Sequence, residues 1–420
     1  MKRFIIVPIL FISILFSEIT YSQIVLPDVT SPTVEKINIL IPPLQSVGSK
    51  NKNATKFVEV LRKDLKNAAL FNLVPGTSTA IKGENVNYQQ LFEEGIDYVV
   101  AGQYQVEGQN LKIALRVFDV RQERPLGGRT YDASPGKIRE AAHRFSNIIM
   151  KQLTGIDGFF TSRVVVVVGG RKRDLFIMDY DGFNSGQLTA HDALVMSPNC
   201  SRDGRRLVFN SDKVWDQDLY VMDLIPRVRE SKISQTFSLE QSAEWSPDGS
   251  KLVFSTNGDI YTSNPNGKNL RRLTKGYSID VSPTWSPDGR RIAFTSDRSG
   301  TPQIYVMSAG GGNIRKLTSG GYNSDPSWSP NSKVNKIAYV NVSGSSANIF
   351  TVNPDGGGIK QLTSGTRRNE TPSWTPDGHF ISYSSNRDVN SDIFLMYFNG
   401  QNQVRLTKGG AKRFPTWCKR

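Results

Sequence analysis

The sequence predicts a small α/β N-terminal domain followed by an all-β six-bladed β-propeller that is closed by strand exchange. Three observations predict it. A short phrase built on Trp-Ser-Pro-Asp-Gly recurs at a fixed period, which indicates one four-stranded unit per repeat. The same order of short apolar segments surrounds each copy of the phrase. The first part of the chain lacks the repeat and carries helical apolar patterns instead.

The repeated phrase is whole at Trp245–Gly249 and Trp285–Gly289, and it reads Trp-Thr-Pro-Asp-Gly at Trp374–Gly378. Degraded copies stand at Cys200–Gly204, Trp328 and Trp417. These anchors lie 40 to 46 residues apart, which is the period of a propeller blade. We expect the tryptophans to be part of the blade core.

Four strands are expected in each repeat. An alternating segment that opens with a polar residue, such as Asp259–Tyr261, has the pattern of a strand with one buried face. An Asp-Gly or Asn-Gly turn follows, because these pairs tolerate positive φ. A short second strand ends in Leu-Thr, and a third ends at the tryptophan. Pro-Asp-Gly then turns the chain into a fourth strand, such as Arg291–Phe294.

The last repeat stops at Arg420, before its fourth strand. The apolar run Arg163–Val168 belongs to no complete repeat and precedes the first one. If this run pairs into the last blade, the ring closes and leaves no open sheet edge, which would invite aggregation. The sequence therefore predicts closure by strand exchange.

Three regions are expected: a signal peptide at 1–22, an α/β domain at 23–160 with a loose arm at 23–33, and the propeller at 161–420. The leader has an early Lys-Arg pair and an apolar run too short for a membrane span. We therefore expect an exported, soluble protein with no membrane span in its mature form, and we expect it to be a monomer. In the α/β domain, Thr55 is the expected cap of one helix, and Gly155 is expected to end another.

The net charge of +14 is compatible with nucleic acid, anionic lipid head groups or an acidic protein as partner. Nucleic acid is the weakest of these, since the cations are scattered along the blades and no nucleic-acid motif occurs. For most individual residues, a solvated basic surface is the simpler interpretation.

Motifs for catalysis are absent from the sequence. The three histidines, His143, His191 and His379, lie far apart without a second ligand at metal spacing, and His143 is expected at the surface. The Gly-x-Ser-x-Gly elbow of a serine hydrolase does not occur. Asp179–Asn184 resembles a calcium loop but lacks its distal glutamate, so a hairpin turn is the favoured interpretation. We expect no enzyme, no cofactor and no metal.

The two cysteines, Cys200 and Cys418, fall in blades that a closed ring makes neighbours. Export would permit a disulfide between them. Equivalent strands of adjacent blades usually lie farther apart than the ~5.5 Å Cα separation that a disulfide requires. Two buried thiols are therefore the favoured expectation.

A leader, an α/β domain and a propeller of this repeat, in this order, resemble the TolB family, periplasmic components of the Tol–Pal system of Gram-negative bacteria. The likeness covers essentially the whole chain and is clearest at Met178–Asn184, Ser282–Gly289 and Phe414–Trp417. Asn331 and the Pro-interrupted arm depart from the family pattern. The resemblance implies a non-catalytic scaffold that binds the lipoprotein Pal at the propeller mouth and TolA through the arm. It also implies a role in outer-membrane integrity and in constriction at cell division, with other envelope lipoproteins as further partners.

The resemblance places the Pal site in the loops between each Leu-Thr and the next tryptophan, which mix aromatic and charged residues as interfaces do. The candidate mouth residues are His191, Asp192, Phe237, Glu240, Gln241, Tyr277, Asp280, Tyr322, Asp325, Arg367, Arg368, Glu370, Arg413 and Phe414. The candidate arm residues are Gln23, Ile24, Val25, Leu26 and Asp28.

Two other functions compete with the scaffold. A carbohydrate-binding propeller of the envelope would need aromatic platforms around the channel, and the loops offer Tyr277 and Tyr322. A periplasmic hydrolase would need an active site that none of the sequence motifs indicates.

Overall fold

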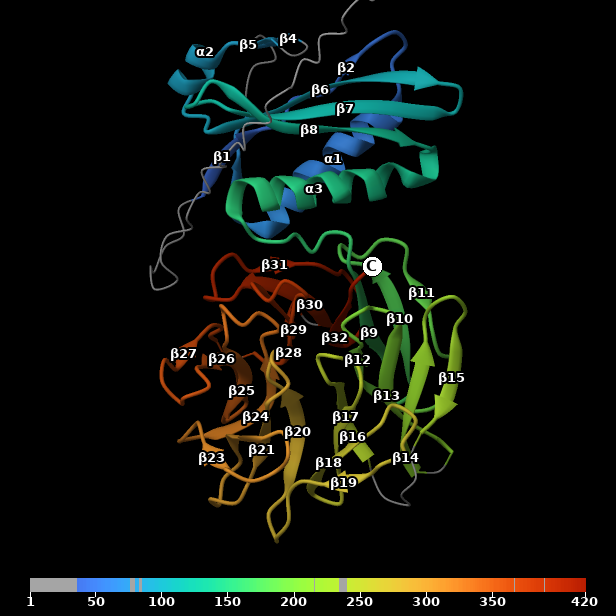
Figure 1. The fold of residues 1–420 in the computed structure, drawn as a ribbon, viewed down its shortest axis with the longest axis vertical. Coiled ribbons are helices and arrows are strands. Elements are labelled where there is room, and N and C mark those ends of the chain that lie inside the picture. Colours follow the sequence, from blue (N-terminus) through green and yellow to red (C-terminus); the bar gives the residue numbers. More distant parts are fainter. Residues whose placement is uncertain are drawn as a thin grey trace, which may run out of the picture.

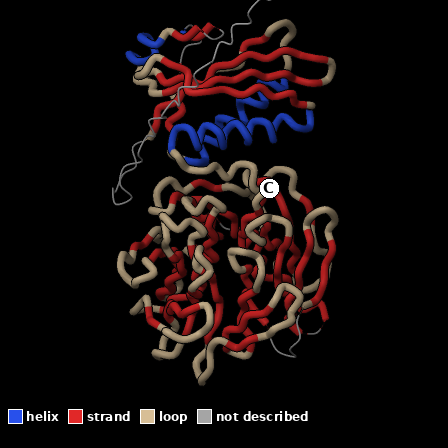
Figure 2. The backbone as a smooth tube through the Cα atoms, viewed as in Figure 1, coloured by secondary structure: helices blue, strands red, loops and turns tan. Residues whose placement is uncertain are grey.

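The computed structural model describes residues 36–75, 80–82, 85–214, 216–233, 240–365, 367–388 and 390–420. The expected signal peptide and arm lie outside the described residues. Two domains follow one another along the chain (Figure 1). Within the described part of the chain, the α-helices belong to the first domain and the second is built of strands (Figure 2).

The first domain is a sheet with the two long helices α1 and α3 on the face toward the propeller, while the short helix α2 lies away from it (Figure 1). The sheet order is β3-β1-β6-β7-β8, and β2 adds to β6. Its elements are β1 (Ile37–Leu40), β2 (Gln45–Ser46), α1 (Lys52–Ala68), β3 (Phe71–Leu73), β4 (Ile81–Lys82), β5 (Asn85–Val86), α2 (Tyr88–Glu93), β6 (Tyr98–Glu107), β7 (Asn110–Asp119), β8 (Arg124–Ala133), η2 (Pro135–Lys137) and α3 (Ile138–Thr154).

Helix α1 begins three residues before the expected cap. Asn51 is its N-cap, and the Asn51 side chain accepts a hydrogen bond from the Asn53 N–H at 2.8 Å. An Asx cap satisfies a free donor of the first turn as well as a threonine would, so sequence alone does not separate the two. Helix α3 ends at Gly155 in the left-handed region (φ 72°), as the sequence predicts.

Six four-stranded sheets make up the propeller. Each blade starts at the strand that ends in the anchor, so blades and sequence repeats are out of phase. The first three blades are β12 (Val195–Cys200), β13 (Arg206–Val214), β14 (Asp216–Asp223) and β15 (Arg229–Lys232); β16 (Glu240–Trp245), β17 (Leu252–Thr256), β18 (Asp259–Ser263) and β19 (Arg271–Arg272); and β20 (Asp280–Trp285), β21 (Arg291–Ser296), β22 (Gln303–Ser308) and β23 (Arg315–Lys316). The last three are β24 (Tyr322–Trp328), β25 (Ile337–Ser343), β26 (Ser346–Val352) and β27 (Lys360–Gln361); β28 (Asn369–Trp374), β29 (Phe380–Asp388), β30 (Asn390–Tyr397) and β31 (Val404–Arg405); and β32 (Lys412–Cys418), β9 (Arg163–Gly169), β10 (Arg173–Asp179) and β11 (Gly186–Gln187).

Two hydrogen-bond motifs within a blade account for the polar residues that recur in the sequence repeat. In the turn after the anchor, Ser246 Oγ donates to Asp248 at 2.6 Å and accepts the Lys251 N–H at 2.9 Å. In the outer half of a blade, Thr407 Oγ1 of the Leu-Thr pair donates to Asp392 at 2.9 Å and accepts the Ile393 N–H at 3.0 Å. The polar residue that opens one strand is thus the partner of the threonine that ends the next.

The anchors join neighbouring blades. The backbone N–H of Trp245 donates to Asn199 Oδ1 of the preceding blade at 3.2 Å, and the backbone N–H of Trp285 donates to Glu244 Oε1 at 3.0 Å. The five tryptophan anchors are buried, with exposed fractions of 4–6 %. This confirms that they are core residues of the blades.

The last blade combines both ends of the propeller. Strand β32, from the C-terminal end, pairs antiparallel with β9, and Trp417 lies opposite Val164. Strand β9 pairs in turn with β10. The run Arg163–Val168 therefore fills the position that the incomplete sixth repeat leaves open.

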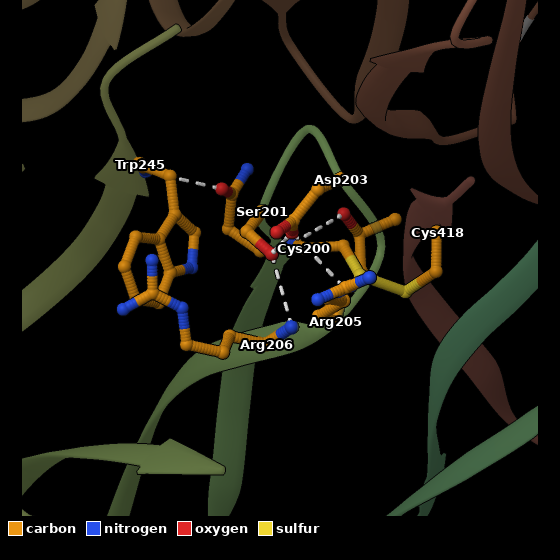
Figure 3. The surroundings of a disulfide bond; sticks show 9 residues. Cys200, Ser201, Asp203, Arg205, Arg206, Trp245 and Cys418 are labelled. Atoms are coloured by element: carbon orange, nitrogen blue, oxygen red, sulfur yellow. Dashed lines mark hydrogen bonds between the residues drawn. A yellow bond between two sulfur atoms is a disulfide. The ribbon is translucent and has the colours of Figure 1, made fainter. Parts of the chain in front are cut away.

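Cys200 and Cys418 form a disulfide across this seam (Figure 3). The expectation of two thiols was wrong. Both cysteines lie on the innermost strands, which converge around the channel, and the Cα–Cα separation is 5.4 Å. That value lies within the range of disulfides, since ~4.4–6.8 Å is usual. The Cys200 N–H also donates to Thr416 Oγ1 at 3.3 Å, which holds β12 and β32 together.

A buried polar cluster fixes the first domain on the last blade. Asp64 of α1 accepts hydrogen bonds from Tyr180 Oη at 2.6 Å and Ser146 Oγ at 2.6 Å, and it lies 2.8 Å from His143 Nδ1. His143 is only 3 % exposed, so its expected surface position was wrong. The expectation rested on the polar residue that follows it, Arg144. The His143 side chain instead faces α1.

The turn after β10 supplies the propeller side of this interface. Asp181 pairs with Arg139 at 2.6 Å and with Lys63 at 3.3 Å, and the Arg139 guanidinium lies 3.8 Å from the centre of the Phe183 ring. The segment Asp179–Asn184 is thus a hairpin turn that docks the first domain, as the turn interpretation predicts. Strands β10 and β32 run in the same direction, because each is antiparallel to β9. The first domain therefore docks at the end where β32 finishes, and the mouth where β32 begins lies at the other end.

Candidate protein-binding mouth of the propeller channel

The mouth of the channel is a cavity of about 140 Å³ that all six innermost strands line. These strands start at the mouth and end at the anchors. A second cavity of about 300 Å³ lies at the anchor end, and Glu244 lines both cavities. Asn199, Ser327, Ser373 and Thr416 line both cavities as well.

Every innermost strand carries a β-bulge at the same position. Each bulge contains one residue with φ between 49° and 52°, in the left-handed region. These six residues are Ser197, Ser242, Ser282, Asp325, Thr371 and Phe414. A bulge re-aims side chains, and strained backbone of this kind concentrates at functional sites. All six residues line the mouth cavity.

Two carboxyl groups line the channel, Asp325 at the mouth and Glu244 farther in. Asp325 accepts hydrogen bonds from Ser282 Oγ at 3.2 Å and Ser324 Oγ at 3.1 Å, and no described cation pairs with it. Asp325 is exposed at the mouth, and partial desolvation by the surrounding channel wall, together with the nearby Glu370, raises its pKa. Deeper in the channel, burial raises the pKa of Glu244 to about 7.

Several of the predicted mouth residues lie where a partner could touch them. Tyr277 is fully exposed (110 %), and Tyr322 is 46 % exposed. Arg367 and Arg413 are exposed, and Arg368 pairs with Glu370 at 2.5 Å. Aromatic and arginine side chains are the types that dominate binding energy at interfaces.

Other predicted residues are held within the fold. Asp280 is fully buried, and both of its oxygens accept hydrogen bonds from Arg298, at 3.0 and 2.9 Å. Its assignment to the interface was wrong, because the polar side chain that opens β20 completes an ion pair inside the blade. His191 pairs with Glu230 at 2.9 Å, and the exposed Asp192 pairs with Lys172.

The arm residues and three of the predicted mouth residues have little or no structural outcome. Phe237 lies outside the described residues, as do the arm residues. Glu240 and Gln241 belong to strand β16.

Sequence reasoning missed Ile279 and most of the bulged residues. Ile279 is 57 % exposed beside Tyr277, although an isolated isoleucine gives no sign of that in a strand-rich sequence. The bulges did leave a signal. In five of the six blades a proline follows the bulged residue, as in Ser282-Pro283, and the anchor stands two positions later.

The described part of the chain contains no group of three or more His, Cys, Asp or Glu side chains that could hold a metal ion. In the same residues, the structure has no helix with the length and apolar character needed to cross a bilayer.

Fold and mouth together define a class: two-domain proteins in which an α/β domain precedes a six-bladed β-propeller with an open channel mouth. A family model described as the TolB beta propeller domain matches residues 150–420, and one described as the TolB amino-terminal domain matches residues 27–126. The chain belongs to the TolB family.

Individual relatives agree with the family models. "Tol-Pal system protein TolB" of Desulfotalea psychrophila is 32 % identical over 232 residues, which cover 53 % of this chain and 51 % of the relative. "Protein TolB homolog" of Chlorobium luteolum is 33 % identical over 286 residues, which cover 66 % of this chain and 65 % of the relative. The alignments thus span half to two thirds of these relatives. The crystal structure of TolB from Acinetobacter baumannii is similar with a TM-score of 0.79 at 25 % identity, covering 91 % of this chain and 97 % of that one.

Proposed function

We propose that this protein is a periplasmic interaction scaffold of the Tol–Pal system. It binds the lipoprotein Pal at the mouth of the propeller and TolA through the arm at 23–33. In this way it contributes to outer-membrane integrity and to constriction at cell division. Other envelope lipoproteins are further candidates for the same mouth, and the scaffold carries out no reaction of its own.

One observation carries the proposal. The mouth combines exposed apolar side chains, namely Tyr277, Ile279 and Tyr322, with a cavity walled by strained backbone and by an unpaired carboxylate. A protruding partner segment could bury the aromatic residues and donate hydrogen bonds to Asp325. Such a centre with a charged rim has the composition of a protein interface.

The arm is the proposed second site. Ile24, Val25 and Leu26 form a short apolar stretch that could add a strand to a sheet edge of a partner, and Pro27 limits its length. Gln23 and Asp28 flank this stretch. If the arm also contacts the folded protein, a partner that captures it would shift affinity at the mouth, by no more than its differential affinity for the two arm positions.

The test is a binding titration of the exported protein with the soluble domain of Pal and, separately, with the C-terminal domain of TolA. Binding of Pal should survive deletion of residues 23–33, and binding of TolA should be lost with it. A shift in Pal affinity on this deletion would support a switching arm, whereas unchanged affinity would leave the arm as a tether.

Two alternatives have their own signatures. The exposed Tyr277 and Tyr322 are compatible with binding of an envelope carbohydrate, and retention of the protein on a glycan resin would favour this alternative. A periplasmic hydrolase would turn over a substrate, so activity in a panel of ester and peptide substrates would favour it.

A further inference from the structure

We infer that the Cys200–Cys418 disulfide, which an exported thiol–disulfide oxidoreductase can form, locks the propeller ring against opening of β32 at its seam. The bond joins residues 218 positions apart and connects the first blade to the last strand of the chain. Figure 3 shows the two side chains meeting between β12 and the C-terminal strand.

The position of the disulfide indicates that it restrains opening of the C-terminal strand. Strand β32 is the single strand that the C-terminal end contributes to its sheet, and β9 is its one partner in that sheet. A terminal strand with one hydrogen-bonded neighbour is a natural starting point for local opening. The disulfide ties this strand to the next blade, so opening of the seam would have to move β12 as well.

The burial of the sulfur atoms sets the order of events. Cys418 is fully buried and Cys200 is 9 % exposed, within an apolar cluster that includes Val165, Leu207 and Phe209. The chain beyond the bond is tightly packed, since a Cβ added at Gly204 would lie 1.7 Å from the Lys419 carbonyl oxygen. An enzyme cannot reach the sulfur atoms once β32 has docked. Oxidation therefore accompanies the final closure of the ring.

The chemistry balances as thiol–disulfide exchange. The thiolate of one cysteine attacks a sulfur of the oxidoreductase disulfide, and a mixed disulfide forms as the other enzyme sulfur leaves as a thiolate. The second cysteine, as its thiolate, then attacks the mixed disulfide. The two protein thiols are oxidised to one disulfide, and the enzyme disulfide is reduced to a dithiol that takes up the two protons.

Closure also positions part of the mouth. Strand β32 carries Arg413 and Phe414, and Phe414 packs against the cluster that contains both cysteines. The bond should therefore hold these side chains at the channel. This consequence rests on the proposed function, whereas the covalent closure does not.

The first experiment needs no variant. Exported protein is unfolded in guanidinium without reductant, alkylated with iodoacetamide and weighed by mass spectrometry. We expect no alkylation, and one carbamidomethyl group per cysteine only after reduction. Dithiothreitol should reduce the bond in denaturant but not in the folded protein. Two free thiols in the exported protein would overturn the inference.

The second experiment measures the consequence. Cys200→Ala with Cys418→Ala removes the bond, and parent protein refolded under reducing conditions is the matched control that keeps both sulfur atoms. In each, hydrogen exchange of β32 and β9 should accelerate at least tenfold, while β21 and β25 exchange as in the parent. The Tm should fall by about 10 °C, as expected for a long closed loop. Parent-like exchange in β32 in both samples would contradict the covalent closure. Pal affinity, measured in the same samples, tests the link to the mouth separately.

Discussion

Individual residues at the mouth fall into two groups that the sequence does not distinguish. Asp280 and Asp325 both lie in innermost strands that end at an anchor, yet Asp280 is buried in an ion pair with Arg298 and Asp325 lines the cavity. The difference comes from the strand register. Asp280 starts its strand opposite Ser296, whereas Asp325 is the bulged residue of its own.

The two exposed tyrosines should carry much of the binding energy for Pal. Tyr277→Ala together with Tyr322→Ala should weaken binding by at least about 2 kcal/mol, since truncation of a central aromatic commonly costs that much. The Tm should stay at the parent value because neither ring is buried. Calorimetric titration measures the affinity, and Ile359→Ala, an exposed apolar residue outside the mouth loops, is the control. Parent-like affinity of the double variant would place the partner elsewhere.

Charge reversal of Arg367 and Arg368 to glutamate should also weaken Pal binding and leave the Tm unchanged. Both side chains are exposed, and rim charges of this kind act mainly on the association rate. Stopped-flow association at two salt concentrations is the measurement. A rate that does not change would remove these arginines from the interface.

Asp280→Ala should act on stability rather than on binding. The change leaves the Arg298 guanidinium, only 26 % exposed, without its partner. Breaking a buried pair costs roughly 3–5 kcal/mol, and partial exposure reduces this to about 2–3 kcal/mol. Urea unfolding measures the loss. A normal unfolding midpoint with impaired Pal binding would return Asp280 to the interface.

Glu244 should give the fold a measurable pH dependence. Burial raises its folded pKa from the usual value of 4.5 to about 7, so the folded state binds more protons than the unfolded state between these values. Stability should therefore decrease as the pH rises from about 4.5 to 7, and Glu244→Gln should remove this slope. Above pH 7 the variant should be more stable by up to about 3 kcal/mol. Urea titrations across this range are the test, and identical slopes in parent and variant would contradict the account.

At the scale of elements, the repeat predicted the strands because each motif is local. Ser246 and Asp248 bond within one turn, and Thr407 and Asp392 bond within one hairpin, so the letters themselves encode the geometry. Contacts between residues that lie far apart in the sequence leave no such local pattern. The Cys200–Cys418 distance depends on how the innermost strands converge, and the burial of His143 depends on where α1 crosses α3.

The same difference between local and long-range structure decides which candidate site residues the sequence could predict. Tyr277 and Tyr322 were predictable because they lie in or next to the connections that lead into an innermost strand. The bulged residues could be identified only from the backbone dihedral angles. The recurring proline before the anchor did indicate that the innermost strands share a local feature. The buried state of Asp280 followed from Arg298, which lies across a hairpin turn.

Deletion of Arg163–Val168 tests the role of β9. This strand pairs with β10 on one side and β32 on the other, so its loss should leave two open edges and give insoluble protein. Deletion of residues 23–33 is the matched control and should leave the protein soluble. Sedimentation of both proteins decides the outcome, and a soluble monomer without Arg163–Val168 would contradict closure through this strand.

On the scale of the whole molecule, the apolar core of the first domain continues across the domain interface into the last blades. Tyr180, Asp64 and His143 are buried at the junction, and Phe159 packs edge-on against Trp417 at 5.5 Å between ring centres. Such an interface favours one fixed arrangement of arm-bearing domain and propeller. The mouth lies at the other end of the blades, so the proposed partners could bind at the same time.

The central claim is that the mouth of the channel binds Pal. Its most direct test is a calorimetric titration of the exported protein with the soluble domain of Pal, run in parallel with the Tyr277→Ala, Tyr322→Ala variant. We predict saturable binding of one Pal per protein and a loss of at least about 2 kcal/mol in the variant. No binding by the parent, or equal binding by both proteins, would contradict the account.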